Sequence, residues 1–248
     1  MSDAVPPLRT FAFGDLDGAA WGIAWFPSSG PAGFVAVGSG EHAVTVEASL
    51  DPDEDNGGWR LHGYGLELNV SAAVEDAPDL RGDFDALCRV RGGITVEAVE
   101  HDVDCLGRLA VHPGTGDLDK FESARDVSAW FDPTHGLSLV ALRPRKSRGQ
   151  EADAVIAVAL EPDGALAIED PRLSTTYAAD GHPLRVGLEL WLAADDDEEE
   201  QFPRRAGGET LGVAAKGRLG RFDVLAQFVR WDSRYGDGAG VYLLAQQS

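Results

Sequence analysis

The chain is poor in positive charge, and in lysine above all. Its 248 residues carry 21 Lys and Arg against 42 Asp and Glu, which gives a formal net charge of −21 at pH 7. Only Lys120, Lys146 and Lys216 are lysines. Such an acidic surface repels the phosphates of nucleic acids and of anionic lipid headgroups. We therefore expect no nucleic-acid partner, and no pattern in the sequence indicates an oligomeric state.

Long apolar runs are also missing. No stretch approaches the roughly 18 apolar residues that a membrane-spanning helix needs, so we expect no membrane insertion. The first ten residues, MSDAVPPLRT, lack the apolar segment of a secretory signal peptide. These features lead us to expect a cytoplasmic protein.

Cysteine and histidine are too scarce and too scattered for a metal centre. Cys88 and Cys105 fit no metal-binding spacing, and no histidine pair has an HxH or HExxH pattern. Strand alternation in FDALCRVR puts Cys88 on an apolar face with Phe84 and Val90, which predicts a buried thiol. A Cys88–Cys105 disulfide stays open as an alternative, although a reducing compartment disfavours it. We expect no metal ion.

The sequence also lacks the motifs of nucleophilic catalysis and of nucleotide binding. It contains no G-x-S-x-G elbow. The run GDGAG (Gly236 to Gly240) lies between strands, so no helix N-terminus follows it to receive a phosphate. We interpret this run as a hairpin turn and expect no cofactor.

What the chain does contain is alternation of apolar and polar residues with a period of two. The run RFDVLAQFVRW places Phe222, Val224, Ala226 and Phe228 on one face, as in a strand with one buried side. Dipeptides typical of tight hairpins stand between such runs: Asp17-Gly18, Asn56-Gly57, Asp163-Gly164, Asp180-Gly181 and Asp237-Gly238. The pattern predicts an all-β protein with antiparallel neighbours.

Three collinear blocks of similar sequence indicate that the second half of the chain repeats the first. The blocks are 11–27 with 129–144, 34–47 with 155–169, and the tetrapeptide Gly-Leu-Glu-Leu at 65–68 and again at 187–190. The offset between the halves drifts only from about 118 to 122 in this alignment, and the order is preserved. We therefore predict an internal duplication.

Each half then holds about eight strands. We place them near 9–14, 19–26, 33–38, 43–49, 58–70, 82–91, 94–102 and 105–112, and near 123–131, 136–143, 153–160, 165–170, 183–193, 209–216, 220–231 and 238–246. Eight antiparallel strands can close into a barrel that holds one small ligand. We predict two tandem lipocalin-like barrels, at residues 1–115 and 116–248. A β-sandwich explains the strand count equally well but gives no reason for eight strands in each half.

This layout resembles the double-calycin group, which includes carotenoid hydratases and tocopherol-cyclase-like proteins. Members often carry an Arg-Asp-x-Ser-Trp-Gly-like stretch where the second barrel begins. The comparable run here is RDVSAWF, in which Arg125, Asp126 and Ser128 match. Trp130 is delayed by one residue, no Gly follows it, and Val127 stands where the group often has His. The resemblance implies a pocket for an isoprenoid or other apolar small molecule, while the departures count against acid–base catalysis.

The candidate catalytic residues are Arg125, Asp126, Asp132 and Arg143. A carboxyl desolvated by aromatic neighbours has a raised pKa and can act as an acid, so Asp126 or Asp132 would donate the proton. Arg125 or Arg143 would stabilise developing negative charge. Adjacent strand residues point to opposite faces, so at most one of Arg125 and Asp126 enters the same lumen.

Tryptophans are the candidate ligand-binding residues: Trp21, Trp25, Trp130, Trp191 and Trp231. The favoured function is binding of an apolar small molecule, of the lipid or isoprenoid class, in a barrel mouth or between the barrels. One alternative is a cofactor-independent isomerase, cyclase or hydratase that acts on such a ligand. A second is a non-catalytic scaffold whose barrels are filled by side chains.

Overall fold

The structure is a computed structural model that describes residues 7–27, 33–53, 57–75, 80, 84–112, 115–145, 153–192 and 202–247. The first half contributes β1 (Leu8–Gly14), β2 (Trp21–Pro27), β3 (Phe34–Ser39), β4 (His42–Val46), β5 (Ala48–Pro52), β6 (Trp59–Gly63), β7 (Leu66–Ala72), β8 (Asp85–Val96) and β9 (Val99–His112). A single 3-10 turn at Leu118–Lys120 follows. The second half contributes β10 (Phe121–Asp132), β11 (His135–Pro144), β12 (Ala154–Glu161), β13 (Gly164–Tyr177), β14 (Pro183–Leu192), β15 (Arg204–Leu219), β16 (Phe222–Ser233) and β17 (Gly236–Gln247).

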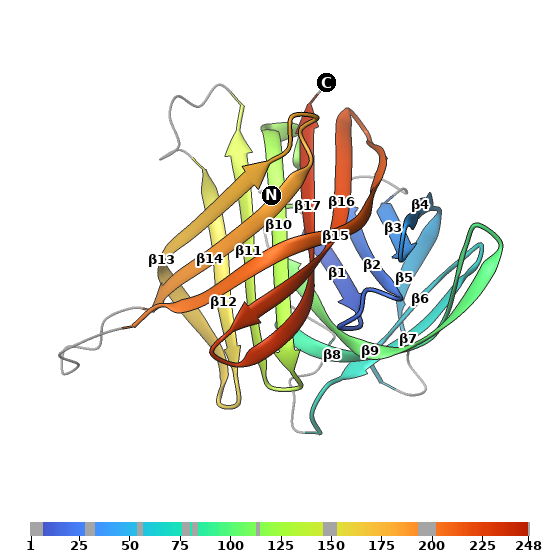
Figure 1. The fold of residues 1–248 in the computed structure, drawn as a ribbon, viewed down its shortest axis with the longest axis horizontal. Coiled ribbons are helices and arrows are strands. Elements are labelled where there is room, and N and C mark those ends of the chain that lie inside the picture. The colour runs from blue at the N-terminus through green and yellow to red at the C-terminus, as the bar shows by residue number, and fades with distance from the viewer. Residues whose placement is uncertain are drawn as a thin grey trace, which may run out of the picture.

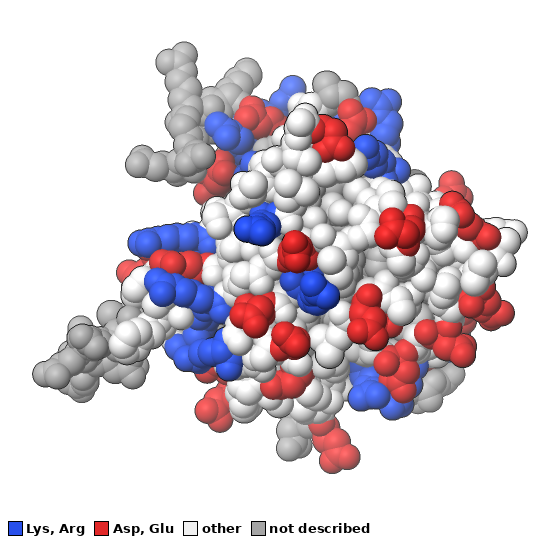
Figure 2. Space-filling model, in the orientation of Figure 1, with Lys and Arg blue, Asp and Glu red and all other residues white. Residues whose placement is uncertain are grey.

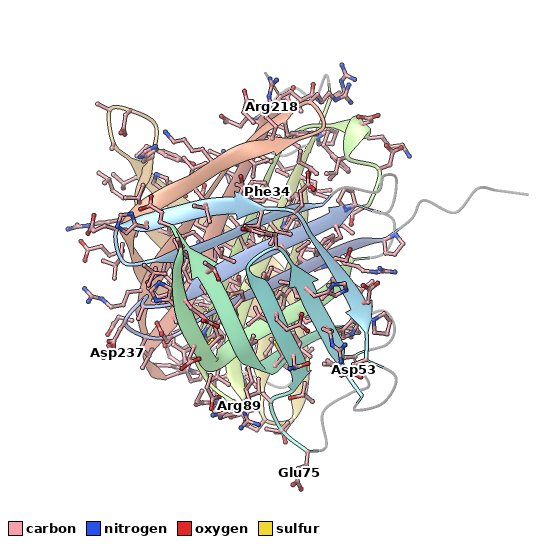
Figure 3. The ribbon with its side chains drawn as sticks, turned by 90° about the vertical axis from the view of Figure 1, so that its right-hand side faces the viewer. Phe34, Asp53, Glu75, Arg89, Arg218 and Asp237 are labelled. Atoms are coloured by element: carbon pink, nitrogen blue, oxygen red, sulfur yellow. The ribbon has the colours of Figure 1, made fainter. Side chains whose placement is uncertain are left out.

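The strands form two barrel-like bodies side by side (Figure 1). Strands β10 to β17 close into an eight-stranded barrel, in which β17 pairs with β10. Strands β1 to β9 form one antiparallel sheet in the order β4-β3-β2-β1-β9-β8-β7-β6-β5, which is a nearly closed barrel. Figure 3 views this curved sheet from its outer side. The predicted all-β fold of two tandem barrels is confirmed.

The two bodies share one topology, and a single strand explains why one is closed and the other open. In the second barrel, β13 pairs with β12 only through residues 164–167, and with β14 from residue 168 onward. In the first, β4 pairs with β3 and β5 pairs with β6, and only Glu47 separates β4 from β5. Cutting the second barrel within β13 reproduces the order of the first sheet strand for strand. The count of nine strands therefore arises from a break in one strand.

Two turns in the first half fall inside predicted strands, and the breaks predicted near 92–93 and 103–104 fall within β8 and β9. Gly65, at a φ of 69°, turns the chain between β6 and β7, within the single strand predicted at 58–70. Glu97 and Ala98 have φ angles of 48° and 65° and form the turn between β8 and β9, within the strand predicted at 94–102. Positive φ is uncommon for non-glycine residues, which is why the sequence gives no signal there.

Three apolar clusters fill the molecule, and one of them lies where the two bodies meet. The interior of the first barrel is packed around residues such as Phe13 and Leu68. The interior of the second is packed around residues such as Leu188 and Val229. The third cluster takes Trp21 and Phe34 from the first body together with Val241 and Phe228 from the second. Strands β3 and β4 contact β15 here, and β1 contacts β17. Both faces of β1, β2, β10 and β17 are therefore buried.

The outer surface carries the acidic excess in a dispersed form. Figure 2 shows carboxylates spread over one face of the molecule with Lys and Arg among them. Within the described ranges, no helix has the length and hydropathy that crossing a bilayer requires.

Gly240 in β17 illustrates how closely the second barrel is packed. A Cβ at this position would overlap the carbonyl oxygen of Ser128 and the indole nitrogen of Trp231, which donates to that oxygen at 3.2 Å. Overfilling a packed interior of this kind costs about 1–3 kcal/mol. We expect Gly240→Ala to lower the free energy of unfolding by this amount in urea titrations. Gly207→Ala is the matched control, because a Cβ there meets no atom within 4 Å, and equal losses for both variants would contradict the expectation.

Candidate ligand-binding site

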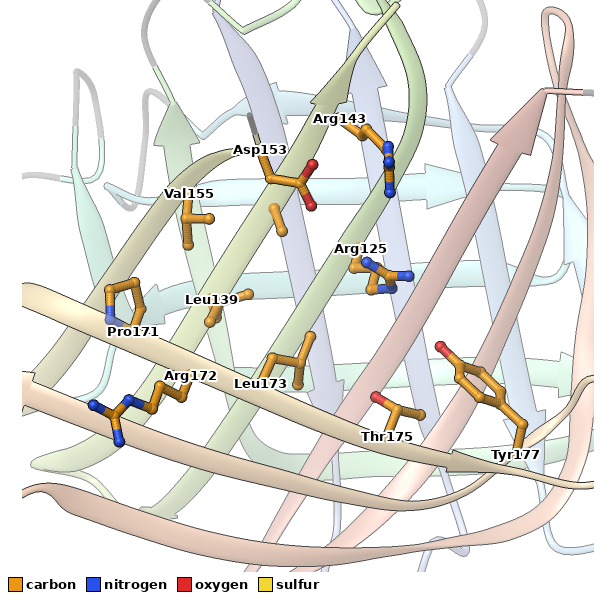
Figure 4. Close-up of a pocket in the computed structure, with 11 residues that line it drawn as sticks. Arg125, Leu139, Arg143, Asp153, Val155, Pro171, Arg172, Leu173, Thr175 and Tyr177 are labelled. Atoms are coloured by element: carbon orange, nitrogen blue, oxygen red, sulfur yellow. The ribbon is translucent and has the colours of Figure 1, made fainter. Parts of the chain in front are cut away.

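A cavity of about 470 Å³ opens at the end of the second barrel where β10 begins (Figure 4). It exists because β12 and β13 separate: their pairing covers only residues 158–161 and 164–167, so residues 154–157 and 168–177 diverge. The side chains that line it come from β10, β11, β12 and β13 and from the residue before β12: Arg125, Leu139, Ala141, Arg143, Asp153, Val155, Pro171, Arg172, Leu173, Thr175 and Tyr177. The cavity is therefore a barrel mouth with a lateral opening between β12 and β13.

Arg125 is a cationic group at the cavity end of β10. It shares the inward face of β10 with Val127 and Ala129, and its guanidinium interacts with the hydroxyls of Tyr177 and Tyr242. Those two hydroxyls lie 2.9 Å apart, and Tyr242 is fully buried. In the described part of the chain, no carboxylate lies within ion-pair distance of Arg125.

The surroundings of Arg125 keep it positively charged beside the neutral phenol of Tyr242. Burial acts to lower the pKa of Arg125, but the interactions with Tyr242 and Tyr177 outweigh it and raise the pKa. Burial and the hydrogen bond with Tyr177 raise the pKa of Tyr242 above its usual value. At neutral pH, Arg125 is therefore charged and the Tyr242 hydroxyl keeps its proton.

Two further arginines and one carboxylate line the same cavity. Arg143 lies 2.8 Å from Glu122, and Arg172 forms ion pairs with Asp170 at 2.6 Å and Glu189 at 3.2 Å. The Oδ1 atom of Asp153 is buried and has no hydrogen-bond partner in the described residues. The cavity thus combines an aliphatic wall with one arginine that lacks a carboxylate partner and one carboxylate oxygen that lacks a donor.

Asp126 faces away from this cavity, toward the first barrel. It is 1% exposed, and its Oδ2 accepts a hydrogen bond of 2.7 Å from the indole of Trp25. Arg108 of β9 lies 3.5 Å from Asp126 and makes bonds of 2.7 and 2.6 Å to Asp85. Because Arg125 and Asp126 are adjacent on β10, strand alternation sends them into different compartments.

This buried network between the barrels is held by one strong ion pair. Burial raises the pKa of Asp85, but the charge and hydrogen bonds of Arg108 outweigh it and lower the pKa overall. Burial also raises the pKa of Asp126, and Arg108 and Trp25 oppose it without reversing the shift. Burial, followed by the charge of Arg108, lowers the pKa of His112 to about 4. His112 is therefore neutral at pH 7, and its Nε2 lies 3.3 Å from Arg108 Nη2.

Asp132 lies at the opposite end of β10 from the cavity and forms a local turn. Its Oδ1 accepts hydrogen bonds from the backbone nitrogens of Thr134 and His135, at 2.7 and 2.9 Å. Its Oδ2 lies 2.8 Å from His135 Nδ1. Burial acts to raise the pKa of Asp132, but these hydrogen bonds lower it overall, so the group is a carboxylate at neutral pH. Its role as an acid stays a prediction.

The five candidate tryptophans lie outside the cavity. Trp21, Trp25 and Trp130 belong to the apolar cluster between the barrels, and Trp130 donates to the carbonyl oxygen of Gly14 at 3.0 Å. Trp231 packs inside the second barrel, and Trp191 donates to Glu189 at 2.9 Å. Their prediction as ligand-binding residues stays untested, but their positions are those of core and rim residues.

Several site residues were not recognised in the sequence. Tyr177, Tyr242 and Asp153 stand in ordinary strand contexts, so no local signal marks them. Arg108 did carry a signal, because it interrupts the apolar run LGRLAV, and a charge on a buried strand face requires a partner. Both cysteines are free thiols, Cys88 fully buried. Among the described residues, no three His, Cys, Asp or Glu side chains cluster as metal ligands would.

No protein-family model matches the chain, and no curated protein matches it in sequence. Solved structures do match. The chain is similar to CghA at 13% identity with a TM-score of 0.60, covering 98% of this chain and 89% of that one. It is similar to a kievitone hydratase from Nectria haematococca at 10% identity and a TM-score of 0.54, over 97% of this chain and 89% of that one.

A putative AttH protein from Nitrosomonas europaea is similar at 11% identity and a TM-score of 0.55, over 97% of this chain and 92% of that one. At these identities the likeness concerns the fold alone. It extends over both barrels of each protein, so it is the paired arrangement, and not one barrel, that is shared. The resemblance to tandem lipocalin-like barrel proteins predicted from the sequence is confirmed at the level of the fold.

Proposed function

We propose that the protein binds an apolar small molecule in the mouth of the second barrel. The observation that carries this proposal is the 470 Å³ cavity, in which Leu139, Ala141, Val155 and Leu173 provide an aliphatic wall around Arg125. Cavities of this size, in which apolar side chains meet convergent polar groups, are the usual sites for small ligands. Here the aliphatic wall stands beside a comparable set of polar side chains. The cavity lies in a barrel mouth, one of the two places that the sequence suggested.

A cavity-filling substitution tests the site. Ala141 lines the cavity and is 8% exposed, so Ala141→Phe would occupy the space that an apolar ligand needs. We expect wild-type protein to bind the neutral dye Nile red with micromolar affinity, and Ala141→Phe to weaken this binding at least tenfold, with little change in Tm. The control is Ala154→Phe, because Ala154 is exposed and adjacent to the lining residue Val155.

Equal dye binding by Ala141→Phe and wild type would overturn this site. Native mass spectra of the gently purified protein, followed by organic extraction, would identify any resident ligand. A stoichiometric apolar adduct is the expected result, and its loss in Ala141→Phe would assign it to the cavity.

Proton transfer without a cofactor is a second candidate function, favoured by Asp153. Asp153 lines the same cavity as Arg125, and its Oδ1 has no hydrogen-bond partner in the part of the chain that the structure describes. Asp153 would take a proton from a carbon next to a carbonyl group. The C–H electron pair would form a C=C bond, and the carbonyl oxygen would become an enolate facing Arg125. In D2O, deuterium should then appear at one carbon of the extracted ligand with wild type and not with Asp153→Asn. This role belongs to Asp153 and not to Asp126 or Asp132, which lie outside the cavity.

A further inference from the structure

We propose that the ligand of the second barrel is an acid, whose carboxylate is received by Arg125 and Tyr177 while its apolar chain extends toward the opening between β12 and β13. This inference rests on the proposed function and adds the chemical class of the ligand. The geometry that carries it is the juxtaposition, within one cavity, of aliphatic side chains and a cation that has no carboxylate partner among the described residues.

The partners of the three cavity arginines distinguish Arg125 from the others. Arg172 is satisfied by Asp170 and Glu189, and Arg143 lies beside Glu122. Among the described residues, Arg125 contacts the phenol hydroxyls of Tyr177 and Tyr242 and no carboxylate. Arg125 is half-buried, so its charge is only partly solvated, and a ligand carboxylate that arrives there gains charge-assisted hydrogen bonds of the strong kind. Arginine also presents a planar set of donors that matches a carboxylate in a bidentate manner.

The charges around Arg125 differ from those of the protein as a whole. The chain carries a net charge of −21, yet the cavity is lined by three arginines and a single carboxylate, Asp153. An acidic surface disfavours anions in general, and two of the three arginines already face carboxylates. Arg125 is therefore the cavity cation that a ligand anion can use. Tyr177, which is 39% exposed, stands where Arg125 meets the opening, and its hydroxyl can donate to the same carboxylate.

The apolar part of the ligand has a defined path. Leu139 and Ala141 of β11 and Leu173 of β13 line the wall, and Val155, 40% exposed, stands at the opening. Exposed aliphatic side chains beside a cavity reduce the cost of leaving part of a hydrocarbon chain at the opening. An acid with its head at Arg125 and its tail between β12 and β13 satisfies both features.

The test compares two ligands that differ only in the head group. Dodecanoate and 1-dodecanol are titrated at pH 8 against the full-length protein carrying Nile red, and displacement of the dye gives each affinity. We expect wild type to bind dodecanoate at least tenfold more tightly than dodecanol. Arg125→Met should weaken dodecanoate binding at least tenfold and dodecanol binding less than threefold, while Arg125→Lys should keep part of the preference. The control is Arg89→Met, which removes one positive charge from an exposed ion pair on the first barrel.

The outcomes separate the inference from the proposed function. Equal affinities of wild type for the acid and the alcohol would overturn the acid ligand while leaving an apolar site in place. Failure to bind dye, acid and alcohol would overturn both. Should Arg125→Met not fold, the wild-type preference, together with a loss of that preference in Tyr177→Phe, decides the question. A preference that Arg89→Met reduces as much as Arg125→Met would reflect overall charge and would also overturn the assignment.

Discussion

Arg108→Met is expected to lower the free energy of unfolding by about 3–5 kcal/mol, the cost typical of removing one partner from a buried ion pair. Arg108 and Asp126 are 3% and 1% exposed, and Arg108 holds Asp85 through two bonds of 2.6 and 2.7 Å. Without the guanidinium, Asp85 keeps, among the described residues, a bond of 3.2 Å from Ser138, and its side chain is 10% exposed, so water replaces little of the lost charge. Urea unfolding at pH 7 measures the loss.

Two control variants show whether burial or the ion pair itself is responsible. Arg89→Met removes an exposed arginine that lies 2.8 Å from Asp104, and such surface pairs contribute about 0–1 kcal/mol. Asp126→Asn keeps an acceptor for the Trp25 indole and removes a group whose pKa burial already raises, so we expect it to cost far less than Arg108→Met. A loss for Arg108→Met no larger than that for Arg89→Met would contradict the interpretation of the network as a buried ion pair.

The turn dipeptides predicted the turns correctly where glycine adopts the turn conformation. They predicted them wrongly where glycine instead allows neighbouring residues to pack closely. Asp17-Gly18 does turn the chain between β1 and β2, with Gly18 at a φ of 66°. The predicted turn at GDGAG was wrong, because residues 236–240 lie within β17 and the turn falls at 234–235. Cβ atoms at Gly238 and Gly240 would overlap Phe131 and the Ser128 carbonyl, so these glycines permit close contact. Sequence alone does not separate the two uses of glycine.

The predicted repeat was likewise right in part and wrong in part. Its first two blocks fall on corresponding hairpins, β1–β2 with β10–β11 and β3–β4 with β12–β13. The shared Gly-Leu-Glu-Leu lies at β7 in one half and in β14 in the other, whereas the strand order matches β7 with β15. The alignment of that third block was wrong, and the tetrapeptide reflects the limited set of residues that suit a strand. The two halves share their topology through the order in which their strands pair, and not through this tetrapeptide.

The site was only half predictable, for a reason that lies in the double barrel itself. Alternation placed Arg125 and Asp126 on opposite faces, as the structure does. Both faces of β10 are buried: Val127 on one face packs inside the barrel, and Trp130 on the other packs between the barrels. An apolar pattern on both faces does not reveal which face is the lumen. Tyr177 reaches Arg125 from β13, 52 residues along the chain, and only the closed barrel brings the two together.

His112 gives the network a pH dependence of predictable sign. The pKa of this imidazole is about 4 in the fold, against 6.5 for the unperturbed group, because burial and the charge of Arg108 disfavour its protonated form. Between pH 6.5 and pH 4, the unfolded chain therefore binds a proton at His112 that the native protein does not bind. The resulting contribution to stability is fully present above pH 6.5 and is lost as the pH falls toward 4. For this pKa pair, it amounts to a loss of about 2 kcal/mol between pH 7 and pH 5.

His112→Gln isolates this contribution, because glutamine keeps an acceptor for Arg108 Nη2 and does not titrate. The two proteins share every other titrating group, so the difference between their free energies of unfolding reports on His112. We expect the wild-type advantage at pH 7 to shrink by about 2 kcal/mol at pH 5, as measured by urea unfolding at half-unit steps. Parallel pH profiles would mean that His112 is solvated in the native protein. The barrels would then separate far enough to admit water at their interface, and the cost predicted for Arg108→Met would fall with it, because both expectations depend on the same dry contact.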